Sequence, residues 1–133
     1  MTTPAWMLND LVNLPGVRHA IVLTADGLVD VHSAGIPRDA ADKFAAALAG
    51  LQSLSRSTAE FCADSPHAPW QQTLVEFDTG YLLTTAAGTG SYLAVSCTSD
   101  VDLPMISHRL HQLVDRLGRE MTNPPRNGTA PRP

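Results

Sequence analysis

One short motif in this sequence has the residue types of a catalytic site. Asp78-Thr79-Gly80 matches the triplet of aspartic proteases, some of which are small homodimers with one triplet in each chain. Two copies would bring together two carboxylates that share one proton. The triplet, however, lies between Phe77 and Tyr81, where two strand-like segments need a tight turn. We therefore interpret it as a hairpin turn and not as an active site.

Three residues near the C-terminus have spacings that would allow them to bind one metal ion. His108, His111 and Asp115 share a face of an expected helix. The apolar residues of that helix form a separate stripe, which places His108 and Asp115 nearly opposite it, in water. No other element is expected to supply ligands there, so we interpret this face as solvated. The expected core stripe consists of Ile106, Leu110, Leu113, Leu117 and Met121.

The remaining motifs do not indicate chemistry. Gly88-Thr89-Gly90-Ser91 would need a helix after it to bind a phosphate group, and a strand-like segment follows instead. The sequence contains neither a Gly-x-Ser-x-Gly nucleophile motif nor a Gly-x-x-x-x-Gly-Lys-Ser/Thr phosphate loop. It therefore predicts a protein that is not an enzyme and that binds neither a metal nor a cofactor.

Composition and charge narrow the class of protein further. The 133 residues suit one domain, and the hydrophobic share of 44% is ordinary for a globular chain. The formal net charge of −4 argues against nucleic acid as a partner. Two cysteines, Cys62 and Cys97, are too few for a disulfide framework. Because the first residues lack a secretory signal and the apolar runs are too short to span a bilayer, we expect a cytoplasmic protein with no membrane insertion.

Turn and cap signals divide the chain into eight elements. Thr3-Pro4 starts a first helix, and Asp26-Gly27 is typical of a hairpin turn. Asp39 and Asp42 resemble a capping box at the start of a long helix, and Asp102 is expected to cap the last one. We expect helices at residues 4–14, 39–63 and 102–121, and strands at 17–24, 28–33, 72–77, 81–86 and 92–98.

The order α-β-β-α-β-β-β-α indicates how these elements pack. Segments 20–23 and 92–95 are apolar on both alternating sets of side chains, which is typical of strands buried on two faces. The long helix would cover one face of the sheet and the terminal helices the other. The sequence thus predicts an α/β (α+β) fold, a three-layer α/β/α sandwich around a five-stranded, mainly antiparallel sheet. This domain spans residues 1–121, and a disordered, Pro-rich tail follows at 122–133.

Several stretches resemble the roadblock/dynein-light-chain family. They are residues 17–24, the turn 25–28, the helix segment 39–51, the strand start 80–83 and the strand 92–95. The resemblance covers about residues 4–121 and is greatest to short bacterial members that are encoded beside a Ras-like small GTPase. It implies a homodimer whose sheet continues across the two-fold axis and whose long helices lie side by side. It also implies a GTPase partner; some bacterial relatives accelerate hydrolysis by their partner without inserting an arginine.

The expected long helix carries an unusual stripe of small residues. On a helical wheel, the core stripe consists of Phe44, Leu48, Leu51, Ser55, Thr58 and Cys62. The opposite stripe has Asp42 and Glu60 at its ends, but its middle is almost all small residues instead of the charged side chains of a solvated face. Small residues allow a second backbone to approach closely. We expect an interface there, with the dimer mate or the GTPase, at Ala46, Ala49, Gly50, Ser53, Leu54, Ser57 and Phe61.

These observations lead to a homodimeric regulatory adaptor that binds a small Ras-like GTPase and modulates its nucleotide cycle, in signal transduction. Other components of the same signalling operon are further candidate partners. The alternative is a signalling scaffold or a small-molecule-sensing dimer without effect on GTP hydrolysis. A deep apolar pocket with convergent polar groups would mark the sensing function.

Deleting residues 122–133 should leave thermal stability nearly unchanged. The segment has no large apolar side chain whose burial would offset the entropy of ordering it. We expect the melting temperature of the shortened chain, measured by circular dichroism, to lie within about 2 °C of the full chain. A decrease of many degrees would show instead that the tail docks on the domain.

Overall fold

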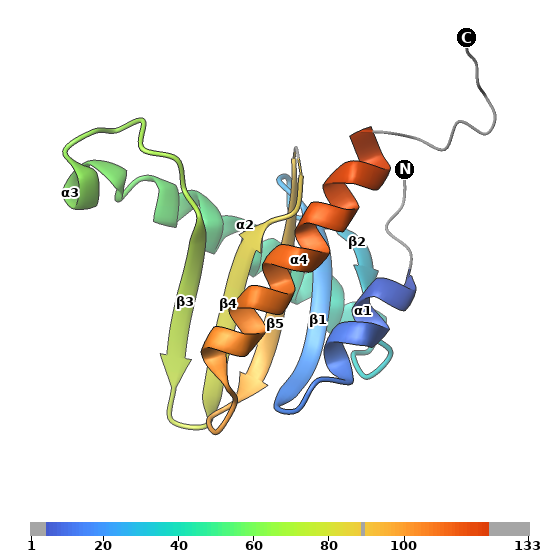
Figure 1. Ribbon diagram of the computed structural model, residues 1–133. Coiled ribbons are helices and arrows are strands. Elements are labelled where there is room, and N and C mark those ends of the chain that lie inside the picture. The colour runs from blue at the N-terminus through green and yellow to red at the C-terminus, as the bar shows by residue number, and fades with distance from the viewer. Residues whose placement is uncertain (1–4, 89, 123–133) are drawn as a thin grey trace, which may run out of the picture.

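The computed structural model describes residues 5–88 and 90–122, which form three layers around one sheet (Figure 1). The expected order of helices and strands is confirmed, with one additional short helix. The elements are α1 (Ala5–Val12), β1 (Val17–Thr24), β2 (Val29–His32), α2 (Arg38–Arg56), α3 (Ala59–Ala63), β3 (Gln72–Phe77), β4 (Gly80–Ala86), β5 (Ser91–Thr98) and α4 (Leu103–Thr122). Residues 123–133, which make up nearly all of the expected tail, lie outside the described residues.

The sheet has five strands in the order β2-β1-β5-β4-β3. All of its neighbouring strands are antiparallel. β5 occupies the middle with β1 beside it, and the doubly apolar segments of both strands are buried, as their sequences predict. β2 and β3 form the two edges, and β2 has only four residues.

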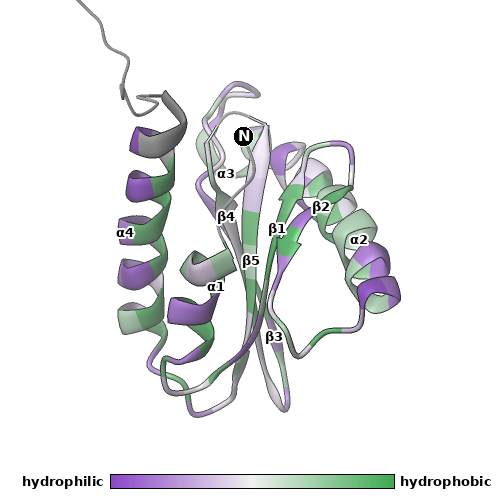
Figure 2. Ribbon diagram, turned by 90° about the vertical axis from the view of Figure 1, so that its right-hand side faces the viewer, coloured by the Kyte–Doolittle hydropathy of each residue, from purple (hydrophilic) through white to green (hydrophobic). Residues whose placement is uncertain are grey.

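Helices cover both faces of the sheet (Figure 2). α1 and α4 lie on one face, and their core includes Leu8, Leu93 and Leu110. α2 lies on the other face, over a smaller core that includes Leu23 and Tyr92. The three-layer sandwich expected from the sequence is therefore confirmed.

The core stripe expected on α4 is buried as far as the structure describes its side chains. Ile106, Leu110, Leu113 and Leu117 are each at most 6% exposed, whereas the side chain of Met121 lies outside the described residues. The helix begins as its sequence predicts, because the Asp102 carboxylate accepts a hydrogen bond of 3.1 Å from the backbone N–H of Met105.

The expected core stripe of α2 is wrong by part of a turn. Leu48 is buried as expected, but Phe44 is half exposed, Leu51 and Ser55 are partly buried, and Thr58 and Cys62 are exposed. Small residues face the sheet in their place. The buried residues of α2 are Ala41, Ala45, Leu48, Ala49 and Gln52.

The small residues of α2 meet the turn between β1 and β2. A Cβ atom placed on Gly27 would lie 3.4 Å from the Cα atom of Ala46 and 3.7 Å from the Cβ atom of Ala49. Gly27 also has a φ of +87°, which only glycine adopts readily. The helix backbone and the turn therefore pack closely, and this close packing within one chain explains part of the alanine content of α2.

The long helix is interrupted after Arg56. Ser57 donates a side-chain hydrogen bond of 2.7 Å to the carbonyl of Leu54, and Thr58 donates one of 2.6 Å to the carbonyl of Ser55. Such side-chain bonds compete with the helical backbone pattern. A single helix to residue 63 was expected, and the structure instead has α2 followed by the separate α3.

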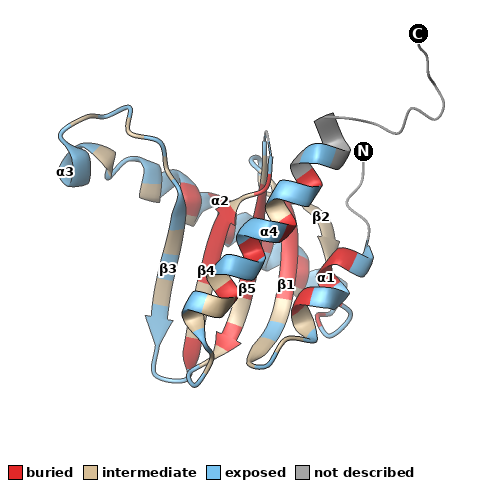
Figure 3. Cartoon of the chain, in the orientation of Figure 1, coloured by how far each residue is buried: buried red, intermediate tan, exposed pale blue. Residues whose placement is uncertain are grey.

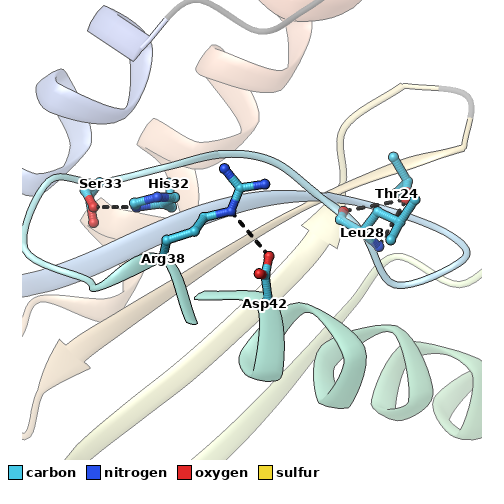
Figure 4. Close-up of polar contacts among 6 residues, drawn as sticks. All are labelled: Thr24, Leu28, His32, Ser33, Arg38 and Asp42. Atoms are coloured by element: carbon cyan, nitrogen blue, oxygen red, sulfur yellow. Dashed lines mark hydrogen bonds and ion pairs between the residues drawn. The ribbon is translucent and has the colours of Figure 1, made fainter. Parts of the chain in front are cut away.

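The capping box expected at the start of α2 is not formed. The helix begins one residue earlier, after Pro37, which makes no side-chain cap. Asp42 instead accepts a hydrogen bond of 3.3 Å from Arg38 on the helix surface, an ion pair that contributes little stability (Figure 4). The turn after β1 is closed as expected, with the backbone N–H of Leu28 donating to the Thr24 hydroxyl at 3.1 Å (Figure 4).

The Asp78-Thr79-Gly80 triplet forms the turn between β3 and β4, as expected. Phe77 and Gly80 are the last paired residues of the two strands, which leaves Asp78 and Thr79 as the connection. Gly80 is buried and lies so close to β5 that an added Cβ atom would overlap the carbonyl oxygen of Cys97. Its role is to allow this approach of two strands.

Gly80→Ala should destabilise the fold. The added methyl group has no room beside the Cys97 carbonyl, so the strands must separate locally, at a cost of about 1–3 kcal/mol. We expect this loss in the free energy of unfolding from urea denaturation. The exposed neighbour Thr79 provides the control, because Thr79→Ala should stay within about 0.5 kcal/mol of the wild type.

Candidate functional site

Most of the large apolar side chains that are exposed lie on α2, α3 and β3. Phe61 is 92% exposed, Leu54 is 69% exposed and Phe77 is 60% exposed, while Phe44 is about half exposed. We call the surface formed by Phe44, Leu54, Phe61 and Phe77 the α2–β3 surface. α3 and β3, which carry part of it, are mostly exposed along their length (Figure 3). An apolar surface of this kind is typical of a protein interface.

A hollow of about 520 Å³ lies within this surface, between α2 and the sheet. Phe44, Ala47 and Leu51 line it from the helix, and Phe77 and Leu82 line it from the sheet. Residues of the central strands β1 and β5 line it as well. The hollow could accommodate apolar side chains of another molecule.

The outer edge of β3 adjoins the α2–β3 surface. β3 pairs with β4 along its whole length, from Gln72 to Phe77, and has no strand on its other side among the described residues. Its outer backbone N–H and C=O groups are therefore available to another chain. The half-exposed Leu74 lies on the other face of the sheet, because it pairs with Leu83 of the α1–α4 core, and α4 leaves it partly uncovered.

A cluster of polar and aromatic side chains fixes the end of α2 over the sheet. The guanidinium group of Arg56 donates a hydrogen bond of 3.2 Å to the Tyr92 hydroxyl. It also lies 5.8 Å from the ring centre of Trp70 and 6.0 Å from that of Tyr92. The two rings meet edge to face at 5.7 Å. Arg56 is thus engaged within its own chain.

Hydroxyl groups continue this cluster into the backbone of α2. The indole N–H of Trp70 donates to the Thr73 hydroxyl at 2.9 Å, and Thr73 donates to the Ser55 hydroxyl at 2.8 Å. Ser55 in turn donates to the carbonyl of Leu51 at 2.8 Å. The chain of bonds ties β3 to α2 and so sets the position of one end of the α2–β3 surface.

The structure exposes most of the interface stripe expected from the sequence. The exposed residues are Ala46, Gly50, Ser53, Leu54, Ser57 and Phe61. Ala49 is a correction to the expected site, because it is buried in the core against the β1–β2 turn. A Cβ atom added to Gly50 would meet no atom within 4 Å, so this position has free space on the helix surface.

Sequence reasoning missed Phe44 and Phe77 as surface residues. The helical wheel assigns Phe44 to the core because large apolar residues usually face the sheet. Phe77 occupies the last position of an edge strand, and the alternation of β3 alone does not show which strand lies at the edge. The available signal is that Phe77 ends a strand directly before a two-residue turn.

The other candidate sites do not assemble. His108 and Asp115 are exposed on α4, as expected, and the His111 ring lies 2.8 Å from the carbonyl of Ser107 on its own helix. The described residues contain no group of three or more potential metal ligands.

Burial raises the pKa of the Cys97 thiol, which keeps it protonated and poorly nucleophilic. Within residues 5–88 and 90–122, no helix is both long and apolar enough to cross a membrane.

The comparisons with known proteins identify the family. The family model described as "Roadblock/LC7 domain" matches residues 5–96, and the chain belongs to this family. A Roadblock/LC7 domain from Streptomyces avermitilis is 30% identical and superposes with a TM-score of 0.83, over 92% of this chain and 100% of that chain. No curated protein gives a significant match.

Two more distant structures share the fold. Myxococcus xanthus MglB is 14% identical, with a TM-score of 0.77 over 89% of this chain and 94% of that one. An MglB described as having a tetrameric arrangement is 18% identical, with a TM-score of 0.73 over 86% of this chain and 84% of that one. The resemblance to the roadblock family that the sequence indicated is therefore confirmed.

Ala46→Arg and Gly50→Arg should test the exposed stripe of α2. Both positions are exposed, so the free energy of unfolding should change by no more than about 0.5 kcal/mol. A long charged side chain at an interface should weaken association a hundredfold or more, or about 3 kcal/mol. Sedimentation measures self-association, and circular dichroism confirms the fold.

His108→Arg is the matched control for these variants. It adds the same side chain to an exposed helix position in the layer on the other side of the sheet. It should leave association unchanged. Normal association in all three variants would show that the exposed stripe of α2 is not an interface.

Proposed function

We propose that this protein is a cytoplasmic, homodimeric adaptor that binds a small Ras-like GTPase and regulates its nucleotide cycle. The observation that carries the proposal is the α2–β3 surface, which combines large exposed apolar side chains with an unpaired strand edge. Exposed apolar side chains and a free strand edge both favour association with another chain. Family membership gives the proposal its direction, because the sequence resembles short bacterial members that are encoded beside such a GTPase.

Self-association would satisfy two requirements of the surface at once. Two β3 edges related by a two-fold axis would pair their free backbone groups and extend the sheet. The two α2 helices would then lie on the same face of the joined sheet, where apolar side chains of one copy could enter the hollow beside Phe44 and Phe77 of the other. Gly50 and Ala46 would allow the helix backbones to approach each other. The described tetrameric arrangement of an MglB supports self-assembly in this fold.

The GTPase would be regulated by binding rather than by a catalytic arginine. Arg56 is the arginine of α2 nearest the exposed stripe, and its guanidinium group is held by Tyr92 and Trp70. An arginine that enters the nucleotide site of a partner must be free to extend. We infer that the adaptor shifts the population of conformations of the GTPase switch regions.

The hollow beside α2 favours a second candidate, a small-molecule-sensing dimer. Besides its apolar walls, the hollow is lined by His19 and Ser96, which lie opposite each other on β1 and β5. The Nδ1 atom of His19 and the Oγ atom of Ser96 are buried without a hydrogen-bond partner among the described residues. If the protein is a small-molecule sensor, an apolar ligand should bind in the hollow and compete with self-association. If it is the adaptor, the second copy of the chain fills the hollow instead.

Binding to a Ras-like GTPase of the native host tests the proposal directly. We expect calorimetry to show at least tenfold tighter binding to the GTPase loaded with a non-hydrolysable GTP analogue than to the GDP form, because the switch regions differ between the two. Single-turnover hydrolysis should change on addition of the adaptor, and Arg56→Ala should preserve that change.

Gly50→Arg and His108→Arg serve again as the test variant and its control. If Gly50→Arg loses GTPase binding and His108→Arg keeps it, the exposed stripe of α2 contacts either the GTPase or the second copy of the chain. Equal affinity for both nucleotide forms, with unchanged hydrolysis, would contradict a regulatory role and leave the scaffold alternative.

A further inference from the structure

The face of the molecule opposite α2 has a groove of its own. It has a volume of about 430 Å³ and lies between α1 and α4. Met7 and Leu11 of α1 and Leu113 of α4 form its apolar floor and are almost fully buried. α1 has eight residues, and the 20 residues of α4 cross the sheet beside it (Figure 1).

The wall that α4 contributes to this groove is basic. Three of the nine Lys and Arg residues of the chain line it, namely Arg109, Arg116 and Arg119. Two carboxylates line the same groove, Asp10 on α1 and Asp115 on α4, yet none of the three arginines forms an ion pair or hydrogen bond with a described residue. In a chain of net charge −4, the three arginines against two carboxylates thus give the groove a formal excess of one positive charge.

One of these arginines is held in place by α1. The guanidinium group of Arg116 lies 4.8 Å from the ring centre of Trp6, a cation–π contact. Stacking on the ring leaves the N–H groups at the edge of the guanidinium free to donate. Because its position is already fixed, Arg116 loses less conformational entropy when it binds a carboxylate.

The spacing of the arginines indicates the shape of an occupant. Arg109 and Arg116 are seven residues apart on one face of α4, which corresponds to about 10 Å along the axis. Leu113 lies between them. A second helix with acidic residues at positions i and i+7 and an apolar residue at i+3 or i+4 would match this pattern in charge and in spacing.

The flanking segments of the chain do not fit this groove. Residues 123–133 contain Arg126 and Arg132 and no Asp or Glu, and residues 1–4 carry no charged side chain. The tail therefore has the same sign of charge as the groove. Nucleic acid is disfavoured by the net negative charge of the whole chain.

We propose that the α1–α4 groove is a docking site for an acidic amphipathic helix of a partner protein. The apolar residue of that helix inserts against Leu11 and Leu113, and its carboxylates bind Arg109 and Arg116. The site lies on the other face of the sheet from the α2–β3 surface, so an occupant there leaves that surface free. The proposal does not depend on binding of a GTPase.

Selection from a library of random 15-residue peptides, displayed on phage and applied to the full chain, tests this site. We expect enrichment of peptides with acidic residues seven apart and an aliphatic residue between them. Their affinity, measured by fluorescence anisotropy, should decrease at least tenfold in the double variant Arg109→Gln/Arg116→Gln. Affinity should also decrease as salt rises from 50 mM to 500 mM, because the contacts are ionic.

Two matched variants complete the experiment. Arg38→Gln removes an exposed arginine on the opposite face and should change the affinity less than twofold, as should Gly50→Arg. Circular dichroism should show that the double variant is folded. Enriched peptides without an excess of acidic residues, or acidic peptides that bind the double variant as tightly as the wild type, would overturn the proposal.

Discussion

The fold depends on the requirement that a sheet whose middle strands are apolar on both sides be covered on both faces. β1, β5 and β4 meet this requirement with α2 on one face and α1 and α4 on the other. The helices do not extend far enough to cover the edge strand β3 as well. Leu74 on one side of β3 and Phe77 on the other therefore remain exposed. The α2–β3 surface is a direct consequence of this shortage of cover.

The sequence predicted those features that depend on local chemistry. The turn at Asp26-Gly27, the cap at Asp102 and the strong apolar periodicity of α4 all have one physical interpretation, and each is present in the structure. Doubly apolar strands predicted burial on two faces, and so the three layers. The family resemblance rested on these same patterns, which is why it indicated the fold reliably.

The orientation of α2 could not be derived from its own sequence. A helical wheel assigns the largest apolar residues to the core, and that rule placed Phe44 inside and Ala49 outside. In the structure, the glycine turn at Gly27 admits the helix backbone, and the helix approaches it with alanines. This choice depends on a turn twenty residues away, so only the tertiary arrangement shows which stripe is buried. The same applies to the groove between α1 and α4, whose arginines are solvent-facing residues on a wheel.

The short helix α3 has a consequence for the energy landscape of the native state. It has five residues, none of them buried, and it follows a segment whose hydroxyl groups donate to carbonyls of the last turn of α2. Little free energy opposes its local unfolding, so its amide protons should exchange with solvent sooner than those of β1 or β5. The most exposed aromatic residue, Phe61, thus belongs to a segment that opens without global unfolding. A partner that binds there must order that segment, which makes its affinity sensitive to temperature and lets the same side chain adapt to surfaces of different shape.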